Sequence, residues 1–135
     1  MTRMEFEDLI GLRYRFGGRD PRTGIDCLWI SGQVLRRIFP NLDPSELPAD
    51  GTEAEALMER ADRGAHIWRL VPKGMSLLRG DLLYGLRGSE HAAYCGVIVD
   101  PCGPLLMTAM PEHGSIRIPL RRLRGLQAVY RRGPR

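Results

Sequence analysis

The spacing of apolar and polar residues predicts an amphipathic helix in the first third of the chain. Ile30, Val34 and Ile38 recur at four-residue intervals, so they lie on one face of a helix. Asp26 precedes this stripe and suits the N-cap position, because its carboxylate can accept a hydrogen bond from a backbone N–H of the first turn. The pattern therefore predicts a helix that starts after Asp26, buries one stripe and runs to about residue 39.

Two other segments have helix signals. Thr2 and Glu5 form a capping box, which predicts a short helix that ends near residue 10. A second capped helix is predicted over residues 52–63, where Gly64 would stop it. Between the first two helices, residues 13–24 carry paired glycines and Asp-Pro and Thr-Gly dipeptides, which are typical of turns.

Beyond residue 80 the apolar period changes from that of a helix to that of a strand. Five segments have this pattern and are separated by turn residues: 81–86, 92–99, 104–110, 115–120 and 126–131. Asp100, Pro101 and Gly103 occupy the first, second and fourth places of a type I turn, which predicts a hairpin over residues 93–110. Helices followed by antiparallel strands predict an α+β fold, and we expect one domain over residues 1–135.

Composition and charge exclude some functions. The 135 residues are 43% hydrophobic and have no apolar run long enough to cross a bilayer, so we expect no membrane span. The N-terminal segment is acidic and lacks the apolar region of a secretory signal, which predicts synthesis in a cytoplasm without a signal peptide. The net charge of +4 is concentrated after Glu112 and could contact nucleic acid, teichoic acid or an acidic protein. We expect a solvated basic face and no nucleic-acid partner, because no nucleic-acid-binding motif is present.

The cysteines direct attention to one residue. Cys27, Cys95 and Cys102 have neither CxxC spacing nor an even count, so we expect reduced thiols, no metal site and no cofactor. Cys27 falls in the first turn of the predicted helix, where unpaired backbone N–H groups and the helix dipole stabilise a thiolate. Cysteine is also among the residues most often buried, so the position alone fits a small apolar core residue equally well.

The wider segment favours the reactive interpretation. The stretch "GLRYRFGGRDPRTGIDCLWISGQVLRRIF" resembles the active-site segment of the NlpC/P60 family of papain-like cysteine peptidases. The match preserves order and spacing at Tyr14, Gly17, Gly18, Gly24, Asp26 and Cys27. It continues in "LRGDLLYGL" and in "YCGVIVDPCGPLLMTAMPEHGSIRIPL", which are similar to the family's strands. The single domain is most like the small family members found among phage tail genes.

The resemblance implies a fold and an activity. The fold would be papain-like, with N-terminal helices packed on an antiparallel sheet. The enzyme would cleave peptide stems of peptidoglycan, with Cys27 attacking the carbonyl and a histidine of the sheet transferring the proton. Tyr14 would lie near the oxyanion, beside the Cys27 backbone N–H. The implied partners are peptidoglycan stem peptides and tail-tip proteins, and the implied location is a virion tail or a tail-like particle.

The other site residues depart from the family pattern. Tyr94 stands where the family has its base histidine, and we assign the base to His91, three residues earlier. Tyr94 therefore marks the face that meets the nucleophile, and strand alternation puts His91 on the opposite face, together with Cys95. We expect His91 to reach the nucleophile only through a bulge or a break in the strand. The residue that orients the imidazole corresponds to Met107 or Thr108, of which only Thr108 has a suitable oxygen. Substrate contacts are assigned to three residues: Asp26, Tyr94 and His113, which could swing inward from its loop.

Three functions remain open from the sequence. The first is an active cell-wall peptidase of a phage-like tail. The second is a catalytically degenerate domain that serves as a structural or peptidoglycan-binding part of the tail tip, which the residues at the histidine positions favour. The third is another reaction of the same superfamily, such as an acyl transfer or an amide hydrolysis on a different substrate.

Overall fold

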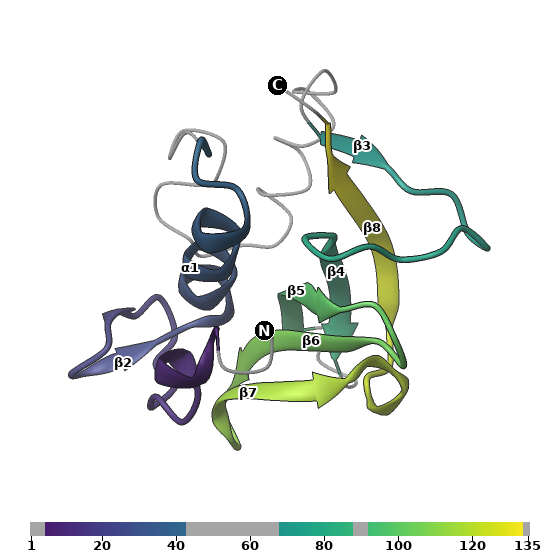
Figure 1. The fold of residues 1–135 in the computed structure, drawn as a ribbon. Helices are drawn as coiled ribbons and strands as arrows, with labels where there is room; N and C mark the ends of the chain where they lie inside the picture. The colour runs from purple at the N-terminus through teal and green to yellow at the C-terminus, as the bar shows by residue number, and fades with distance from the viewer. Residues whose placement is uncertain (1–4, 43–67, 88–91, 134–135) are drawn as a thin grey trace.

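The computed structural model describes residues 5–42, 68–87 and 92–133. Within these residues one α-helix, α1 (Cys27–Ile38), is accompanied by short 3-10 turns and by strands (Figure 1). The strands are β1 (Arg19–Asp20), β2 (Gly24–Ile25), β3 (Trp68–Leu70), β4 (Leu82–Arg87), β5 (Ala92–Asp100), β6 (Leu105–Met110), β7 (Gly114–Pro119) and β8 (Leu126–Arg132). The predicted helix over residues 52–63 lies outside the described residues.

The sheet contains six strands in the order β3-β8-β4-β5-β6-β7, and each neighbouring pair is antiparallel. The strand direction turns markedly between β8 and β7, and α1 lies against one face of the sheet (Figure 1). That face is formed mainly by β5 and β6, which the helix contacts. The α+β class and the antiparallel sheet predicted from the sequence are therefore confirmed.

Apolar side chains cover both faces of the sheet. On the α1 face, Ile30 and Val34 of the helix pack in one core with Val97 and Met107 of the strands, and all four are fully buried. A second core occupies the opposite face and contains Leu83, Ile98, Leu106 and Val129. The β3–β4 connection and the segment before β8 cover this second core through Val71, Leu77, Leu120 and Leu123. The sheet is thus the middle layer, and odd-numbered residues of β5 face the helix.

The predicted secondary structure is confirmed in the strands and in α1, and differs at the N-terminus. Where a helix was expected to end near residue 10, the described part has only a 3-10 turn, Glu7–Leu9. Phe6 and Leu9 are buried, and Gly11 then adopts a φ of 87°, which turns the chain away. Burial of these two side chains against the core, and not helical periodicity, determines this segment. Strand β3 was not predicted, because it has only three residues.

Ion pairs hold the N-terminal segment against α1. Both guanidinium nitrogens Nη1 and Nη2 of Arg37 donate to the Asp8 carboxylate, each at 2.7 Å, and Nη1 also donates to the Glu5 carbonyl. The hydrogen bonds from Arg37 lower the pKa of Asp8. Arg79 forms a second ion pair with the Glu5 carboxylate. These contacts fix the segment that leads to the N-terminus of α1.

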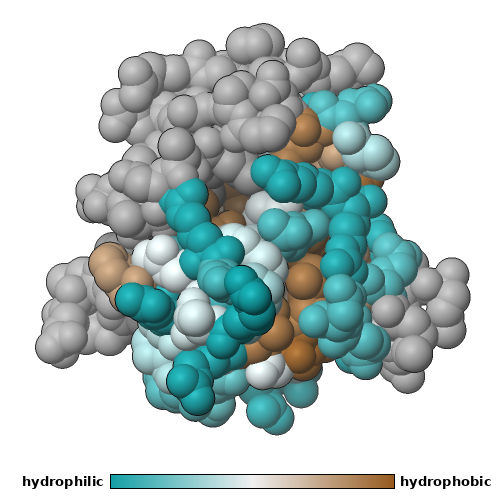
Figure 2. Space-filling model, turned by 90° about the vertical axis from the view of Figure 1, so that its left-hand side faces the viewer, coloured by the Kyte–Doolittle hydropathy of each residue, from teal (hydrophilic) through white to brown (hydrophobic). Residues whose placement is uncertain are grey.

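The surface on the α1 side is mainly hydrophilic. Figure 2 shows this side, where polar side chains surround a strip of apolar residues. Within residues 5–42, 68–87 and 92–133, no helix has the length and apolar character needed to cross a membrane.

Candidate functional site

The N-terminus of α1 has the cap that the sequence predicts. Asp26 has extended backbone angles, and its Oδ1 accepts a hydrogen bond of 2.8 Å from the backbone N–H of Trp29. Its carbonyl accepts the first intrahelical bond, from Ile30, at 3.2 Å. Cys27 is consequently the first residue of the helix, where the positive end of the helix dipole is strongest.

A tight turn brings the chain to this helix start. Gly24 has a φ of 143°, and a Cβ built on it would lie 2.4 Å from the Cβ of Arg15, so only glycine fits. Ile25 bridges Tyr14 in parallel, with backbone hydrogen bonds to Arg13 and Arg15. Tyr14 is half-buried against the core and thus lies alongside the residues that precede Cys27.

The sheet presents a second cysteine to the helix. The Sγ atoms of Cys27 and Cys95 are 3.8 Å apart. Cys95 is fully buried on β5, and its sulfur is also 3.4 Å from Oγ of Ser31, one turn along α1 from Cys27. Cys27 itself is half-buried. The residue of the sheet that meets Cys27 in the described structure is therefore a thiol.

The two thiols have opposite pKa shifts. The pKa of Cys27 is lowered, chiefly because the Cys95 thiol donates a hydrogen bond to its sulfur, which outweighs the effect of burial. The pKa of Cys95 is raised well above its ordinary value by the same hydrogen bond and by complete burial. A negative charge on this pair is therefore concentrated on the Cys27 sulfur, at the helix N-terminus. This is the electrostatic arrangement of a nucleophilic cysteine.

The role of Asp26 is to cap the helix. Its side chain is buried, and burial raises the pKa of its carboxyl group despite the hydrogen bond from Trp29. The negative charge of Asp26 opposes ionisation of the neighbouring Cys27. Asp26 therefore fixes the helix start at Cys27, and its Oδ1 is engaged by the backbone N–H of Trp29.

Thr108 and Tyr94 are not brought to Cys27. The hydroxyl of Thr108 donates to the carbonyl of Cys95 at 2.7 Å, and its side chain shares the sheet face of Leu106, away from α1. The hydroxyl of Tyr94 donates to the carbonyl of Arg124 at 3.2 Å, and its ring covers Gly85 on the same far face. Strand alternation explains both positions, because the helix-facing residues of β5 and β6 are odd-numbered.

Of the three histidines in the sequence, the described residues contain only His113. His113 is exposed in the turn between β6 and β7, where its backbone N–H donates to the Met110 carbonyl. His91 lies outside the described residues, as does His66. The residue pair at the site that the sequence reasoning missed is Cys95 and Ser31. Cys95 could have been located from strand alternation, because it lies on the same face of β5 as the apolar residues Val97 and Val99, which pack against the helix.

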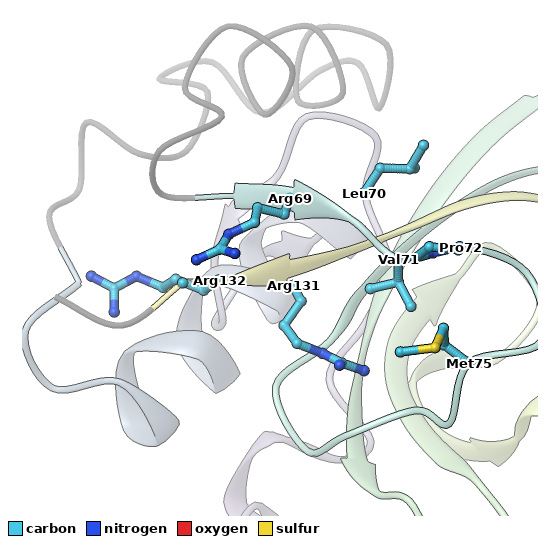
Figure 3. A pocket seen from close by; sticks show the side chains of 8 residues that line it. Arg69, Leu70, Val71, Pro72, Met75, Arg131 and Arg132 are labelled. Atoms are coloured by element: carbon cyan, nitrogen blue, oxygen red, sulfur yellow. The ribbon is translucent and has the colours of Figure 1, made fainter.

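Two cavities lie elsewhere on the molecule. One, of about 310 Å³, is formed where β3 and β8 meet and is lined by Arg69, Leu70, Met75 and Arg131, among others (Figure 3). The other, of about 390 Å³, lies between residues 70–77 and β8. Cys27 lines neither of these two cavities.

The described residues contain no group of three or more His, Cys, Asp or Glu that could hold a metal ion. In the comparisons with known proteins, the chain matches no protein-family model and no curated protein sequence. The chemistry of the site therefore rests on the geometry at Cys27.

Proposed function

We propose that the chain is an NlpC/P60-like cysteine peptidase that cleaves stem-peptide amide bonds of peptidoglycan, and that it acts as a component of a phage tail or a tail-like particle. The observation that carries the proposal is the placement of Cys27, the first residue of a buried helix that faces an antiparallel sheet, with its thiol pKa lowered. The ordered motif from Tyr14 to Cys27 supports the same family.

The proposed reaction uses Cys27 as the nucleophile. Its sulfur attacks the scissile carbonyl, and the resulting oxyanion is held by the Cys27 backbone N–H, with Tyr14 nearby. A base takes the thiol proton and returns it to the leaving amine, after which water hydrolyses the thioester.

His91 is the proposed base. In the sequence it has the same parity as Cys95, and Cys95 meets Cys27 across the helix–sheet interface. Equal parity alone does not bring the histidine to Cys27, because four residues of extended strand span about 13 Å, so the assignment of His91 as the base rests on the resemblance. Thr108 is not part of this proposal, because its hydroxyl is bonded on the far face.

A degenerate, peptidoglycan-binding domain is the second candidate. It is favoured by the Cys95 thiol at 3.8 Å from Cys27, since a thiol with a raised pKa is a poor substitute for a histidine base. The domain would then hold wall peptides without cutting them.

One assay distinguishes the two candidates. Purified sacculi of several wall types are incubated with the reduced full-length protein, and soluble muropeptides are identified by mass spectrometry while bound protein is measured by sedimentation. We expect new amino termini within the stem peptides. Sedimentation with sacculi without any released muropeptide would contradict the peptidase and support the binding domain. Neither release nor sedimentation on any wall type would contradict both.

A further inference from the structure

The Cys27–Cys95 pair has a geometry that no step of the proposed hydrolysis uses. Their sulfurs are 3.8 Å apart, one on the first turn of α1 and the other on β5. A disulfide requires a separation of about 2.05 Å, so the two sulfurs must approach by less than 2 Å. The Cys95 thiol donates its hydrogen bond directly to the Cys27 sulfur.

We propose that Cys27 and Cys95 form a redox site, in which peroxide oxidises Cys27 and Cys95 then closes a reversible disulfide. The proposal concerns the two thiols themselves, and only its consequence for hydrolysis rests on the proposed function. A disulfide would occupy the sulfur that attacks the substrate, so oxidation would switch the peptidase off and a dithiol reductant would switch it on.

The two cysteines differ in a way that assigns their roles. Residue Cys27 is partly exposed, whereas Cys95 is fully buried, so Cys27 is the more accessible of the two. The lowered pKa of Cys27 increases its thiolate fraction, and the thiolate is the form that peroxide oxidises. Cys27 is therefore the oxidised residue and Cys95 the resolving residue.

The reaction balances with peroxide as the only added reactant. In the first step the Cys27 thiolate attacks one peroxide oxygen and the O–O bond breaks, which gives a sulfenic acid and a hydroxide that takes up the proton released by Cys27 and leaves as water. In the second step the Cys95 sulfur attacks the Cys27 sulfur, the S–O bond breaks, and the Cys95 proton leaves with the oxygen as a second water. The Ser31 hydroxyl, 3.4 Å from the Cys95 sulfur, can stabilise the thiolate that forms on Cys95 during this attack.

Cys102 provides an internal control. It is exposed in the turn after β5, and the stretch of β5 from Cys95 to Asp100 alone spans roughly 17 Å. Cys102 therefore cannot replace Cys95 as the resolving thiol within one molecule. Trypsin leaves Cys95 and Cys102 on one peptide, residues 88–117, and Cys27 on another, residues 23–36. A Cys102→Ser background is needed to make the cross-link unambiguous.

The test oxidises the full-length Cys102→Ser protein with a small excess of hydrogen peroxide and analyses it by intact mass and non-reducing peptide mapping. We expect the loss of two hydrogen atoms, a cross-link between peptides 23–36 and 88–117, and recovery of both thiols with dithiothreitol. Cys95→Ser in the same background should instead retain a sulfenic acid at Cys27 that dimedone labels.

Each alternative outcome has a defined meaning. Oxygen addition to Cys27 without any cross-link, in a protein that still contains Cys95, would overturn the proposal. A cross-link confined to the unfolded protein in denaturant would do the same, because it would show that the fold does not pair the sulfurs. If the disulfide forms in a protein that releases no muropeptides, the redox site stands and only the proposed hydrolysis fails.

Discussion

Replacement of Cys27 by alanine is expected to reduce the rate of muropeptide release by about 10⁴-fold or more, to the level of buffer alone. The reason is that no other nucleophile in the described site can form the thioester. Cys95 is fully buried and its pKa is raised, so it remains protonated and out of reach of the substrate. The rate is measured as muropeptides released from sacculi per unit time, by chromatography and mass spectrometry.

Cys102→Ala is the matched control, because it removes an exposed thiol that is not part of the site. It should leave the rate unchanged. Circular dichroism should confirm that Cys27→Ala retains the fold, since the substitution keeps the helix cap on Asp26. A Cys27→Ala protein that is folded and still hydrolyses peptidoglycan at the wild-type rate would exclude Cys27 as the nucleophile.

Replacement of Arg131 by alanine is expected to lower the free energy of unfolding by about 3–5 kcal/mol, the usual cost of leaving a buried charge without its partner. Asp81 is fully buried between the turn before β4 and β8. Its Oδ1 accepts from Nε of Arg131 at 2.9 Å and its Oδ2 from Nη2 at 2.8 Å. Oδ2 also accepts from the backbone N–H of Leu78 at 2.8 Å. Urea denaturation measures the change.

Arg22→Ala provides the comparison for Arg131→Ala. Arg22 pairs with the half-buried Asp20 at 3.4 Å, and its own side chain is 89% exposed. Its removal should change the free energy of unfolding by less than about 1 kcal/mol. Equal effects of the two substitutions would show that water replaces Arg131 at Asp81 and that the buried ion pair does not hold β8 against the β4 turn.

The sequence predicted those elements whose local pattern and tertiary environment agree. Helix α1 combines an aspartate cap with an apolar stripe, and both features are used in the fold. The hairpin of β5 and β6 was located by its turn, where Oδ1 of Asp100 accepts from the N–H of Cys102 and Gly103 has a φ of 62°. The N-terminal segment was less predictable, because burial of Phe6 and Leu9 replaced helical hydrogen bonding.

The sequence located Cys27 at the start of α1 and did not locate the residues that surround it. Cys27 could be located because its helix start is encoded within a few neighbouring residues. Which face of β5 meets α1 is decided by packing of the whole sheet, and alternation alone gives two equivalent choices. In the structure, Val97 and Val99 are buried against the helix, so Cys95, on the same face of β5, lies beside Cys27. The same choice sent Thr108 and Tyr94 to the opposite face.

Activation of Cys27 as a nucleophile should appear in the pH dependence of its alkylation. Iodoacetamide labelling of Cys27 is followed by peptide mass spectrometry in the folded protein and in denaturant. We predict a half-maximal rate in the folded protein at a pH below that of a free thiol, about 8.5.

The pH of half-maximal alkylation in the folded protein should shift in opposite directions in two variants. Cys95→Ala removes the thiol that donates a hydrogen bond to Cys27, so it should raise this pH midpoint. Asp26→Asn removes a neighbouring negative charge while keeping the helix cap, so it should lower the midpoint. A midpoint in the folded wild-type protein at or above that in denaturant, unchanged in Cys95→Ala, would contradict the activation of Cys27.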